Sequence, residues 1–219
     1  MDISEVDKSK KLIAFSFDDA PAKCLEELIA VFTAFNERHP DCKASATLFC
    51  NGKRINEHTA TTLKIATTVG FELGNHSFSH ADLTTLSKNE LLREIDDTDE
   101  LLKTVDGKSV HLLRTPYGKT SDLVKQTAKT PIIDWTVDTL DWTGRSADKI
   151  YQTVLNEVYS GAIVLFHDGY LETVSAVKKL LPDLKEKGYQ VVSVSKLSKA
   201  HDCPLKKGSV YIRARKKSG

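Results

Sequence analysis

The sequence predicts an α/β domain in which about seven parallel strands form a barrel with helices on its outside. Apolar segments of strand length alternate with segments whose apolar residues recur at helical spacing, and no linker or low-complexity segment interrupts this β-α order. Polar residues suited to chemistry also follow the carboxyl ends of several separate strands. In a β/α barrel those ends meet on one face, where active sites are built.

The individual elements follow from the apolar pattern. We expect strands at residues 11–17, 44–50, 70–74, 110–113, 131–135, 161–166 and 189–194. We expect helices at residues 25–35, 56–69, 87–105, 121–129, 147–159 and 171–187. Ser87 and Glu90 form a capping-box pattern at the start of the 87–105 helix. The acidic residues of this helix mostly lie off its apolar stripe, so we expect them on a solvated face: Glu94, Asp96, Asp97, Asp99 and Glu100.

Length and composition are those of an ordinary globular domain. The 219 residues allow one large core, and 40% hydrophobic with 28% charged residues is a typical balance. The net charge of +1 gives no overall attraction to nucleic acid, so we expect none as a partner. No apolar run approaches the roughly 20 residues that a membrane-spanning helix needs. We expect one domain over residues 1–219, with a core of about 11–197.

The two ends and the cysteines leave alternatives open. The first residues are polar and lack the apolar core of a signal peptide, so the chain is either cytosolic or a mature form whose export signal was removed. Residues 198–219 are basic, which suits a solvated terminus better than contact with an anionic wall polymer. The cysteines form no C-x-x-C pair and are either two disulfides or ordinary buried thiols: Cys24, Cys42, Cys50 and Cys203.

Two adjacent carboxylates, Asp18 and Asp19, follow the first expected strand and precede Pro21. Adjacent residues that leave a strand point in different directions, so the two can hold different roles. A turn in which Asp caps the next helix would explain the pair if it stood alone. Four later stretches supply the partners that a catalytic pair needs, and this favours function.

His76 and His80 are four residues apart, which on a helical turn places both imidazoles on one face. Surface histidines reach this spacing by chance, so the spacing alone does not identify a metal site. With Asp19 it forms a set of two nitrogens and one oxygen that leaves a coordination position for water, as in catalytic zinc sites. Asp18 is then the candidate general base, and Arg114 can hold it by a charge-assisted bond.

His167 follows the most apolar strand of the chain and is a candidate general acid, because imidazole can donate a proton near neutral pH. A packed core histidine is the alternative. Asp141 can orient the ring and raise its pKa. Trp142 and Leu165 can form the wall of a small apolar pocket.

In their order along the chain, these stretches resemble the motifs of the polysaccharide deacetylase family, the NodB-homology carbohydrate esterases of family 4. FDDAP at 17–21 resembles T-F-D-D-G-P, HSFSH at 76–80 matches H-[ST]-x-x-H, and RTPYG at 114–118 matches R-x-P-Y-G. DTLDW at 138–142 resembles D-x-x-D-W, and LFHD at 165–168 resembles L-x-H-D. Each motif is weak by itself, but the ordered set over about 11–197 is specific. Ala20 in place of the family's glycine and Ala81 in place of a frequent proline concern loop geometry and substrate fit.

The resemblance implies a distorted (β/α) barrel, NodB-like, that removes acetyl groups from sugars with one divalent metal. Zinc is the metal expected, with cobalt, nickel or manganese as alternatives. By motif, the resemblance implies Asp18 as base, tethered by Arg114, and His167 as acid with Asp141 as its partner. The implied metal ligands are Asp19, His76 and His80, and the Tyr117 backbone N–H would donate to the oxyanion. The residues implied at the substrate are Pro116, Tyr117, Trp142 and Leu165.

These observations predict a metal-dependent hydrolase acting on an acetylated polysaccharide or oligosaccharide. The substrate is either an N-acetylglucosamine polymer such as peptidoglycan or chitin, or acetylxylan, since an amide and an ester need the same acid. We expect a monomer that is extracellular or associated with the cell wall. An inactive carbohydrate-binding protein on the same barrel is the alternative from another class, and a cytosolic metabolic deacetylase is a third.

Overall fold

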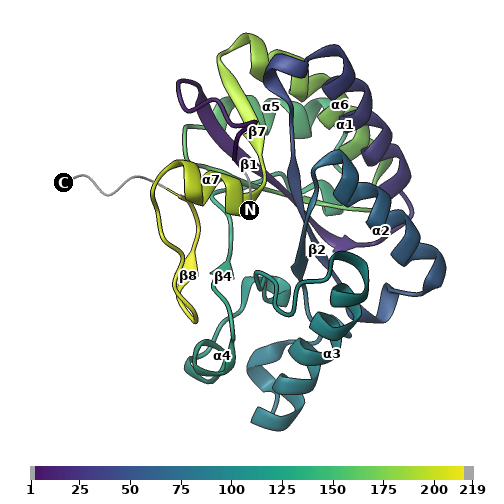
Figure 1. Ribbon diagram of the computed structural model, residues 1–219, viewed down its shortest axis with the longest axis vertical. Coiled ribbons are helices and arrows are strands. Elements are labelled where there is room, and N and C mark those ends of the chain that lie inside the picture. Colours follow the sequence, from purple (N-terminus) through teal and green to yellow (C-terminus); the bar gives the residue numbers. More distant parts are fainter. Residues whose placement is uncertain (1–2, 215–219) are drawn as a thin grey trace.

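A parallel sheet built around strand β1 (Lys11–Ala20) forms the centre of the computed structural model, which describes residues 3–214 (Figure 1). β1 lies between β2 (Ala46–Cys50) and β6 (Ile163–His167), and β3 (Glu72–Asn75) and β5 (Val137–Asp138) extend the sheet to the order β3-β2-β1-β6-β5. β7 (Tyr189–Val192) pairs with Lys11–Ala14, the first part of β1. All of these pairings are parallel, which confirms the predicted α/β class.

Single bridges extend the sheet toward a closed barrel. Leu113 bridges both Asn75 of β3 and Ile132 of β4 (Ile132–Ile133), and β4 pairs in parallel with β8 (Val210–Tyr211). An antiparallel bridge joins Arg213, just after β8, to Ala162, just before β6. The expected strand at 110–113 is therefore wrong in extent, because Leu113 pairs with each neighbour through one residue only. The strand expected at 131–135 is likewise reduced to β4.

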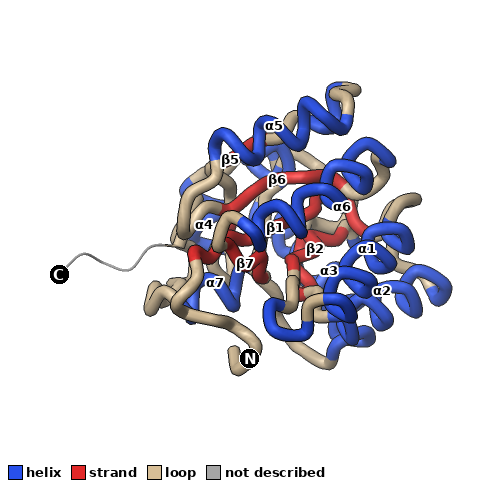
Figure 2. The backbone as a smooth tube through the Cα atoms, turned by 90° about the horizontal axis from the view of Figure 1, so that it is seen from above, coloured by secondary structure: helices blue, strands red, loops and turns tan. Residues whose placement is uncertain are grey.

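The helices cover the outside of the sheet, as the view from above in Figure 2 shows. They are α1 (Leu25–Arg38), α2 (Glu57–Val69), α3 (Lys88–Asp106), α4 (Asp122–Thr127), α5 (Ala147–Glu157) and α6 (Leu171–Glu186). The predicted capping box of Ser87 and Glu90 is present at the start of α3. The pattern did not predict the short helix α7 (Val194–Ala200), which begins where the last strand was expected to continue. Within residues 3–214, no helix is long and apolar enough to cross a membrane.

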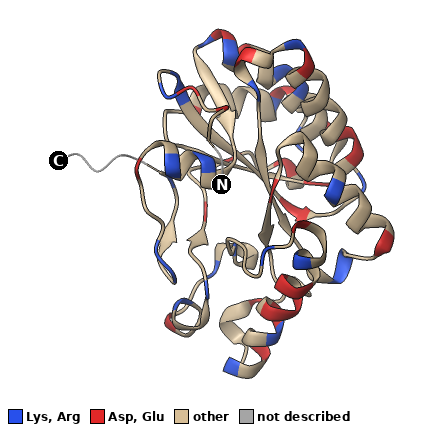
Figure 3. Ribbon diagram, viewed as in Figure 1, with Lys and Arg blue, Asp and Glu red and all other residues tan. Residues whose placement is uncertain are grey.

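The surface carries charges of both signs (Figure 3), and the thiols are free. Charges of both signs are distributed over the outer helices (Figure 3). Lys206, Lys207 and Arg213 are exposed, while the basic residues Arg215, Lys216 and Lys217 lie outside the described residues. The cysteines form no disulfide in the part of the chain that the structure describes, and Cys24, Cys42 and Cys50 are buried.

Alternate residues of β1 face two different environments. The residues packed against the outer helices are Ile13, Phe15 and Phe17. Leu12 and Ala14 belong instead to an apolar cluster inside the barrel, which includes residues of α7. With the two-residue period of a strand, Ser16 and Asp18 continue this inward series. The interior therefore changes from apolar to polar toward the carboxyl end of β1.

Arg114 is the largest fully buried side chain and fills the interior beside that polar end. Its guanidinium carbon lies 4.1 Å from the centre of the Phe49 ring and 5.6 Å from that of Trp135. Nη1 of Arg114 donates to Oδ1 of Asp18 at 2.7 Å. Because both groups are buried, the removal of either would leave an uncompensated charge, at a cost of about 3–5 kcal/mol.

We predict that Arg114→Met lowers the free energy of unfolding by roughly 3–5 kcal/mol, because the buried carboxylate of Asp18 loses its partner. Denaturant unfolding followed by circular dichroism measures this. Lys119→Met is the matched control: it breaks the more exposed ion pair with Asp82, 2.6 Å between Nζ and Oδ2, and should lower the free energy of unfolding much less, because solvent screens an exposed pair. Equal effects of the two substitutions would contradict the prediction.

Candidate functional site

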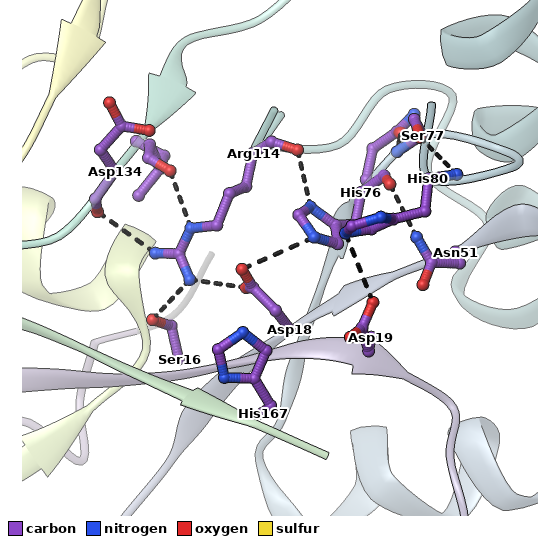
Figure 4. Close-up of polar contacts among 12 residues, drawn as sticks. Ser16, Asp18, Asp19, Asn51, His76, Ser77, His80, Arg114, Asp134 and His167 are labelled. Atoms are coloured by element: carbon purple, nitrogen blue, oxygen red, sulfur yellow. Dashed lines mark hydrogen bonds and ion pairs between the residues drawn. The ribbon is translucent and has the colours of Figure 1, made fainter. Parts of the chain in front are cut away.

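An irregularity near the end of β1 separates the two adjacent aspartates. The pairing of β1 with β2 shifts between Phe17 and Ala20, and Asp19 has a positive φ of 65°. The buried Asp18 points toward Arg114, whereas the partly exposed Asp19 points toward His80 (Figure 4). The left-handed residue is Asp19, and Ala20 stays in the strand, so the alanine in place of the family's glycine adds no left-handed strain.

The side chains of Asp19, His76 and His80 converge at the carboxyl ends of β1 and β3 (Figure 4). One candidate ligand atom from each lies within 4.8 Å of the others. Nε2 of His80 is 3.7 Å from Oδ1 of Asp19, and the two imidazole centroids are 5.0 Å apart. Two imidazole nitrogens and one carboxylate oxygen suit zinc and related divalent ions. The three residues therefore fit a single divalent cation.

His76 is oriented by a backbone carbonyl. Its Nδ1 lies 2.8 Å from the carbonyl oxygen of Arg114, which can only accept, so Nδ1 carries the proton and Nε2 presents its lone pair to the site. Nε2 is 3.6 Å from Oδ2 of Asp18. Burial lowers the pKa of His76 although Asp18 opposes this effect, and a neutral ring is the form that binds a metal.

Left-handed backbone geometry is concentrated in this region. Six residues other than glycine have a positive φ in the described chain, and five of them lie at the site: Asp19, Ser77, His80, Tyr117 and Leu140. Each such residue costs about 1–3 kcal/mol unless its surroundings enforce the conformation, and such strain is typical of functional sites. The surrounding hydrogen bonds must therefore hold these turns in place.

Two residues that sequence reasoning missed supply part of this support. Asn51 donates from Nδ2 to the carbonyl of His76 and from its backbone N–H to the carbonyl of Ala20, both at 2.8 Å. Arg54 donates from Nη1 to the carbonyl of Asp19 at 2.7 Å. The one available signal was their place just after a strand, at the same rim as the motif residues. No local pattern distinguishes them from other loop residues.

Arg114 holds Asp18 in one orientation. Nη1 contacts both Oδ1 of Asp18 at 2.7 Å and Oγ of Ser16 at 2.8 Å, and the remaining guanidinium donors reach two backbone carbonyls. Burial opposes ionisation of Asp18, but the charge of Arg114, with the His76 and His167 rings, holds the pKa of Asp18 below its usual value. Asp18 is therefore an ionised proton acceptor at neutral pH.

His167 and Asp141 form a second pair beside Asp18. Nδ1 of His167 lies 2.7 Å from Oδ1 of Asp141, and the backbone N–H of His167 donates to Oδ2 at 2.8 Å. Thr173, which the sequence did not identify, donates to the same Oδ2 at 2.7 Å. Burial disfavours the imidazolium, but the bond to Asp141 and the charge of Asp18 outweigh burial and raise the pKa of His167. The pair is suited to proton donation.

The residues expected at the substrate lie around these groups. Tyr117 is 63% exposed, and its ring meets that of His80 edge-on with centroids 4.7 Å apart. Pro116 is buried in the same turn. Trp142 is 53% exposed and directly follows Asp141. Leu165 is buried and precedes His167 by two residues, so both face the same side of β6.

Comparison with known proteins supports the same family. Residues 5–131 match a family model described as polysaccharide deacetylase. The chain is 34% identical, over 88% of its length, to the peptidoglycan-N-acetylmuramic acid deacetylase PdaC of Bacillus subtilis, and 31% identical, over 87%, to a bifunctional xylanase/deacetylase of Pseudobutyrivibrio xylanivorans. The matches cover 40% and 31% of those proteins, so the chain spans less than half of either relative.

Solved structures share the fold over nearly the whole chain. The T48 deacetylase with substrate matches with 30% identity and a TM-score of 0.86, covering 94% of this chain and 99% of that one. A family 4 acetyl xylan esterase from Clostridium thermocellum with a cobalt ion matches with 26% identity and a TM-score of 0.82, covering 93% and 98%. BA3943 of Bacillus anthracis, named a pseudoenzyme, matches with 28% identity and a TM-score of 0.75, covering 87% and 66%.

The sequence match, the shared fold and the order of the site motifs lead to one conclusion: this chain belongs to the polysaccharide deacetylase family, the carbohydrate esterases of family 4.

Proposed function

We propose that this protein is a metal-dependent hydrolase that removes acetyl groups from an acetylated carbohydrate. The observation that carries the proposal is the meeting of three groups at one rim: the candidate ligand set, Asp18 held by Arg114, and His167 held by Asp141. A relative on this fold is named a pseudoenzyme, so the fold alone does not imply activity. Support for activity comes from the complete set of polar groups in this chain.

Asp19, His76 and His80 would hold the metal, for which we propose zinc, with cobalt, nickel or manganese as substitutes. When bound, the metal supplies Lewis-acid activation of a water molecule and of the acetyl carbonyl. A neutral His76 is ready for this role, since its proton is on Nδ1 and faces the carbonyl of Arg114.

Asp18 would act as the general base. Its Oδ1 is engaged by Arg114, which leaves Oδ2 free to accept a proton from the attacking water on the side of His76. The guanidinium keeps this carboxyl ionised before the attack, so that it is available as a base. The backbone N–H of Tyr117 would donate to the oxygen that becomes negative in the tetrahedral intermediate.

His167 would act as the general acid. Its Nδ1 is bonded to Asp141, so Nε2 carries the proton that passes to the departing nitrogen or oxygen of the sugar. Acetate is then released. Trp142 and Leu165 would surround the acetyl methyl group, and the Pro116–Gly118 turn would border the sugar.

The substrate class is proposed at the level of acetylated polysaccharides. Relatives of this chain are named for the deacetylation of peptidoglycan, and one is a bifunctional xylanase/deacetylase. An N-acetyl group and an O-acetyl ester both need water activation and a proton for the leaving group, so the groups described here serve either. Such polymers are found in or outside the cell wall, and we propose that the protein works there.

We predict that the zinc-loaded protein releases acetate from at least one member of a panel of chitooligosaccharides, peptidoglycan and acetylxylan, because the residues proposed as base, acid and ligands are all present and close together. Acetate is measured enzymatically. Removal of the metal with a chelator, or His80→Ala, should abolish release while circular dichroism shows a folded domain. Polymer binding without acetate release from any substrate would instead identify an inactive carbohydrate-binding protein.

We predict that His167→Ala slows hydrolysis of an N-acetyl sugar by about 10²–10⁴-fold. An amine leaves only when it is protonated, whereas the phenolate of an aryl acetate leaves unaided, so the aryl ester should be affected much less. Both rates are compared on metal-loaded protein. An equal loss on both substrates would argue against the acid role, and an accompanying fall in the melting temperature would assign His167 to packing.

A third expectation concerns pH. The imidazolium of His167 is the donor, and its raised pKa keeps that form present above the usual histidine range, so activity should fall only as pH rises through the raised value. Asp141→Asn removes a cause of the shift and should move the alkaline limb of kcat/KM to lower pH. Asp138→Asn, which alters a carboxylate bonded to the backbone of Leu140, is the control and should leave that limb in place. An unmoved limb in Asp141→Asn would refute the coupling.

A further inference from the structure

A buried chain of hydrogen bonds links helix α3 to the turn that carries His76 and His80. Its central residue is Asn75, the last residue of β3, which is fully buried. Nδ2 of Asn75 donates to the carbonyl of Ile95 at 2.8 Å and to Oδ1 of Asp99 at 3.0 Å, and both partners belong to α3. The third polar contact of this side chain is also made inside the protein: Oδ1 of Asn75 accepts a hydrogen bond from the turn itself.

The hydrogen bond that Asn75 accepts comes from Ser77, a left-handed residue of the turn. The backbone N–H of Ser77 donates to Oδ1 of Asn75 at 2.9 Å, and Oγ of Ser77 accepts from the backbone N–H of His80 at 3.1 Å. Ser77 and His80 have φ values of 64° and 63°, a conformation that needs outside support in residues other than glycine. Asn75 therefore anchors a turn whose geometry decides where both imidazoles point.

Asp99 is itself fixed from its other side. It is 4% exposed, and its Oδ1 lies 2.9 Å from Nδ1 of the buried His111. Nε2 of His111 lies 3.2 Å from Oδ1 of Asp106, so the ring is held between two carboxylates from α3. The contact with His111 supports the orientation in which Asp99 accepts from Asn75.

The finding corrects one expectation from the sequence. The acidic residues of α3, a helix with many red segments in Figure 3, were expected on a solvated face. Asp99 is buried instead, and Glu94 binds both the backbone N–H and the hydroxyl of Ser79, at 2.8 and 2.6 Å. Two acids of α3 thus contact the 75–80 segment, because the helix packs against β3 with that face.

We propose that Asn75 and Asp99 are positioning residues that set the affinity of the site for its metal. This rests on the metal site of the proposed function. The Asn75–Asp99 contact holds the 75–80 turn in its strained form before a metal binds. Metal binding then costs less conformational entropy, because the turn is already ordered. Outer partners of metal ligands commonly change metal affinity by about 10–100-fold when they are removed.

Asp106 provides a matched control. Both Asp99 and Asp106 contact His111, both have side chains that are 6% exposed, and both lie on α3, but only Asp99 bonds to Asn75. A role limited to packing would make the two aspartates equivalent with respect to metal binding. A positioning role separates them.

The experiment measures the Zn²⁺ dissociation constant by competition with a chromophoric chelator, together with the melting temperature of the metal-free protein. Asp99→Ala should raise the dissociation constant about 10–100-fold. Asp106→Ala should lower the melting temperature and leave the dissociation constant unchanged. Asp99→Asn, which keeps an oxygen acceptor for Asn75, should restore part of the affinity. Asn75→Ala tests the same contact from its other end if Asp99→Ala does not fold.

The outcomes separate this inference from the function on which it rests. If the wild-type protein and every folded Asp99 or Asn75 variant bind Zn²⁺ equally well, the positioning role is overturned. The proposed function then stays intact. Equal losses of affinity in Asp99→Ala and Asp106→Ala would also overturn it, since a general loosening of α3 would then be the cause. Wild-type protein without Zn²⁺ affinity would overturn the metal site and this inference together.

Discussion

The buried ion pair between Arg114 and Asp18 is the interaction on which the rest of the structure depends. A guanidinium inside a barrel loses its hydration, and only close and well-directed partners make its burial tolerable. Asp18 supplies the opposite charge at 2.7 Å, and Phe49 supplies an aromatic face at 4.1 Å. The residue with the proposed catalytic charge is therefore also the residue that balances the charge of the core. Stability and the proposed chemistry would then depend on one carboxylate.

The polar end of the barrel is held by contacts that come from outside it. Asn51, Arg54 and Asn75 each bond to the backbone of a turn that carries a candidate metal ligand. Because these turns include left-handed residues, they would relax without those bonds. The candidate site therefore has two layers of residues: an inner one that contains the candidate metal ligands, and an outer one whose hydrogen bonds hold the left-handed turns in place.

Membership of the family indicates the type of reaction but does not show that this chain is active. Deacetylases and a named pseudoenzyme share this fold with the present chain, so the barrel is a scaffold on which activity depends on a few side chains. In this chain two pairs of charged or titratable groups have different environments: Arg114 with Asp18, and Asp141 with His167. Arg114 favours the ionised form of Asp18, and Asp141 favours the protonated form of His167. A base and an acid with opposed protonation states are what hydrolysis of an acetyl group needs at one pH.

The sequence by itself determined the class of fold, the order of its main elements and the motif residues, because apolar periodicity and strand-end polar residues are local signals. The strand predicted at 110–113 is reduced to single bridges at Leu113, and β8 was not predicted, since pairing through one or two residues depends on neighbours rather than on pattern. The short helix α7 was not predicted either. Tertiary structure alone decided which polar residues support the motifs. Arg114 meets Ser16 across 98 positions, and Asn75 meets Asp99 across 24. A helix acid such as Asp99 has the same local pattern whether it faces water or a buried amide, and only the packing of α3 against β3 distinguishes the two.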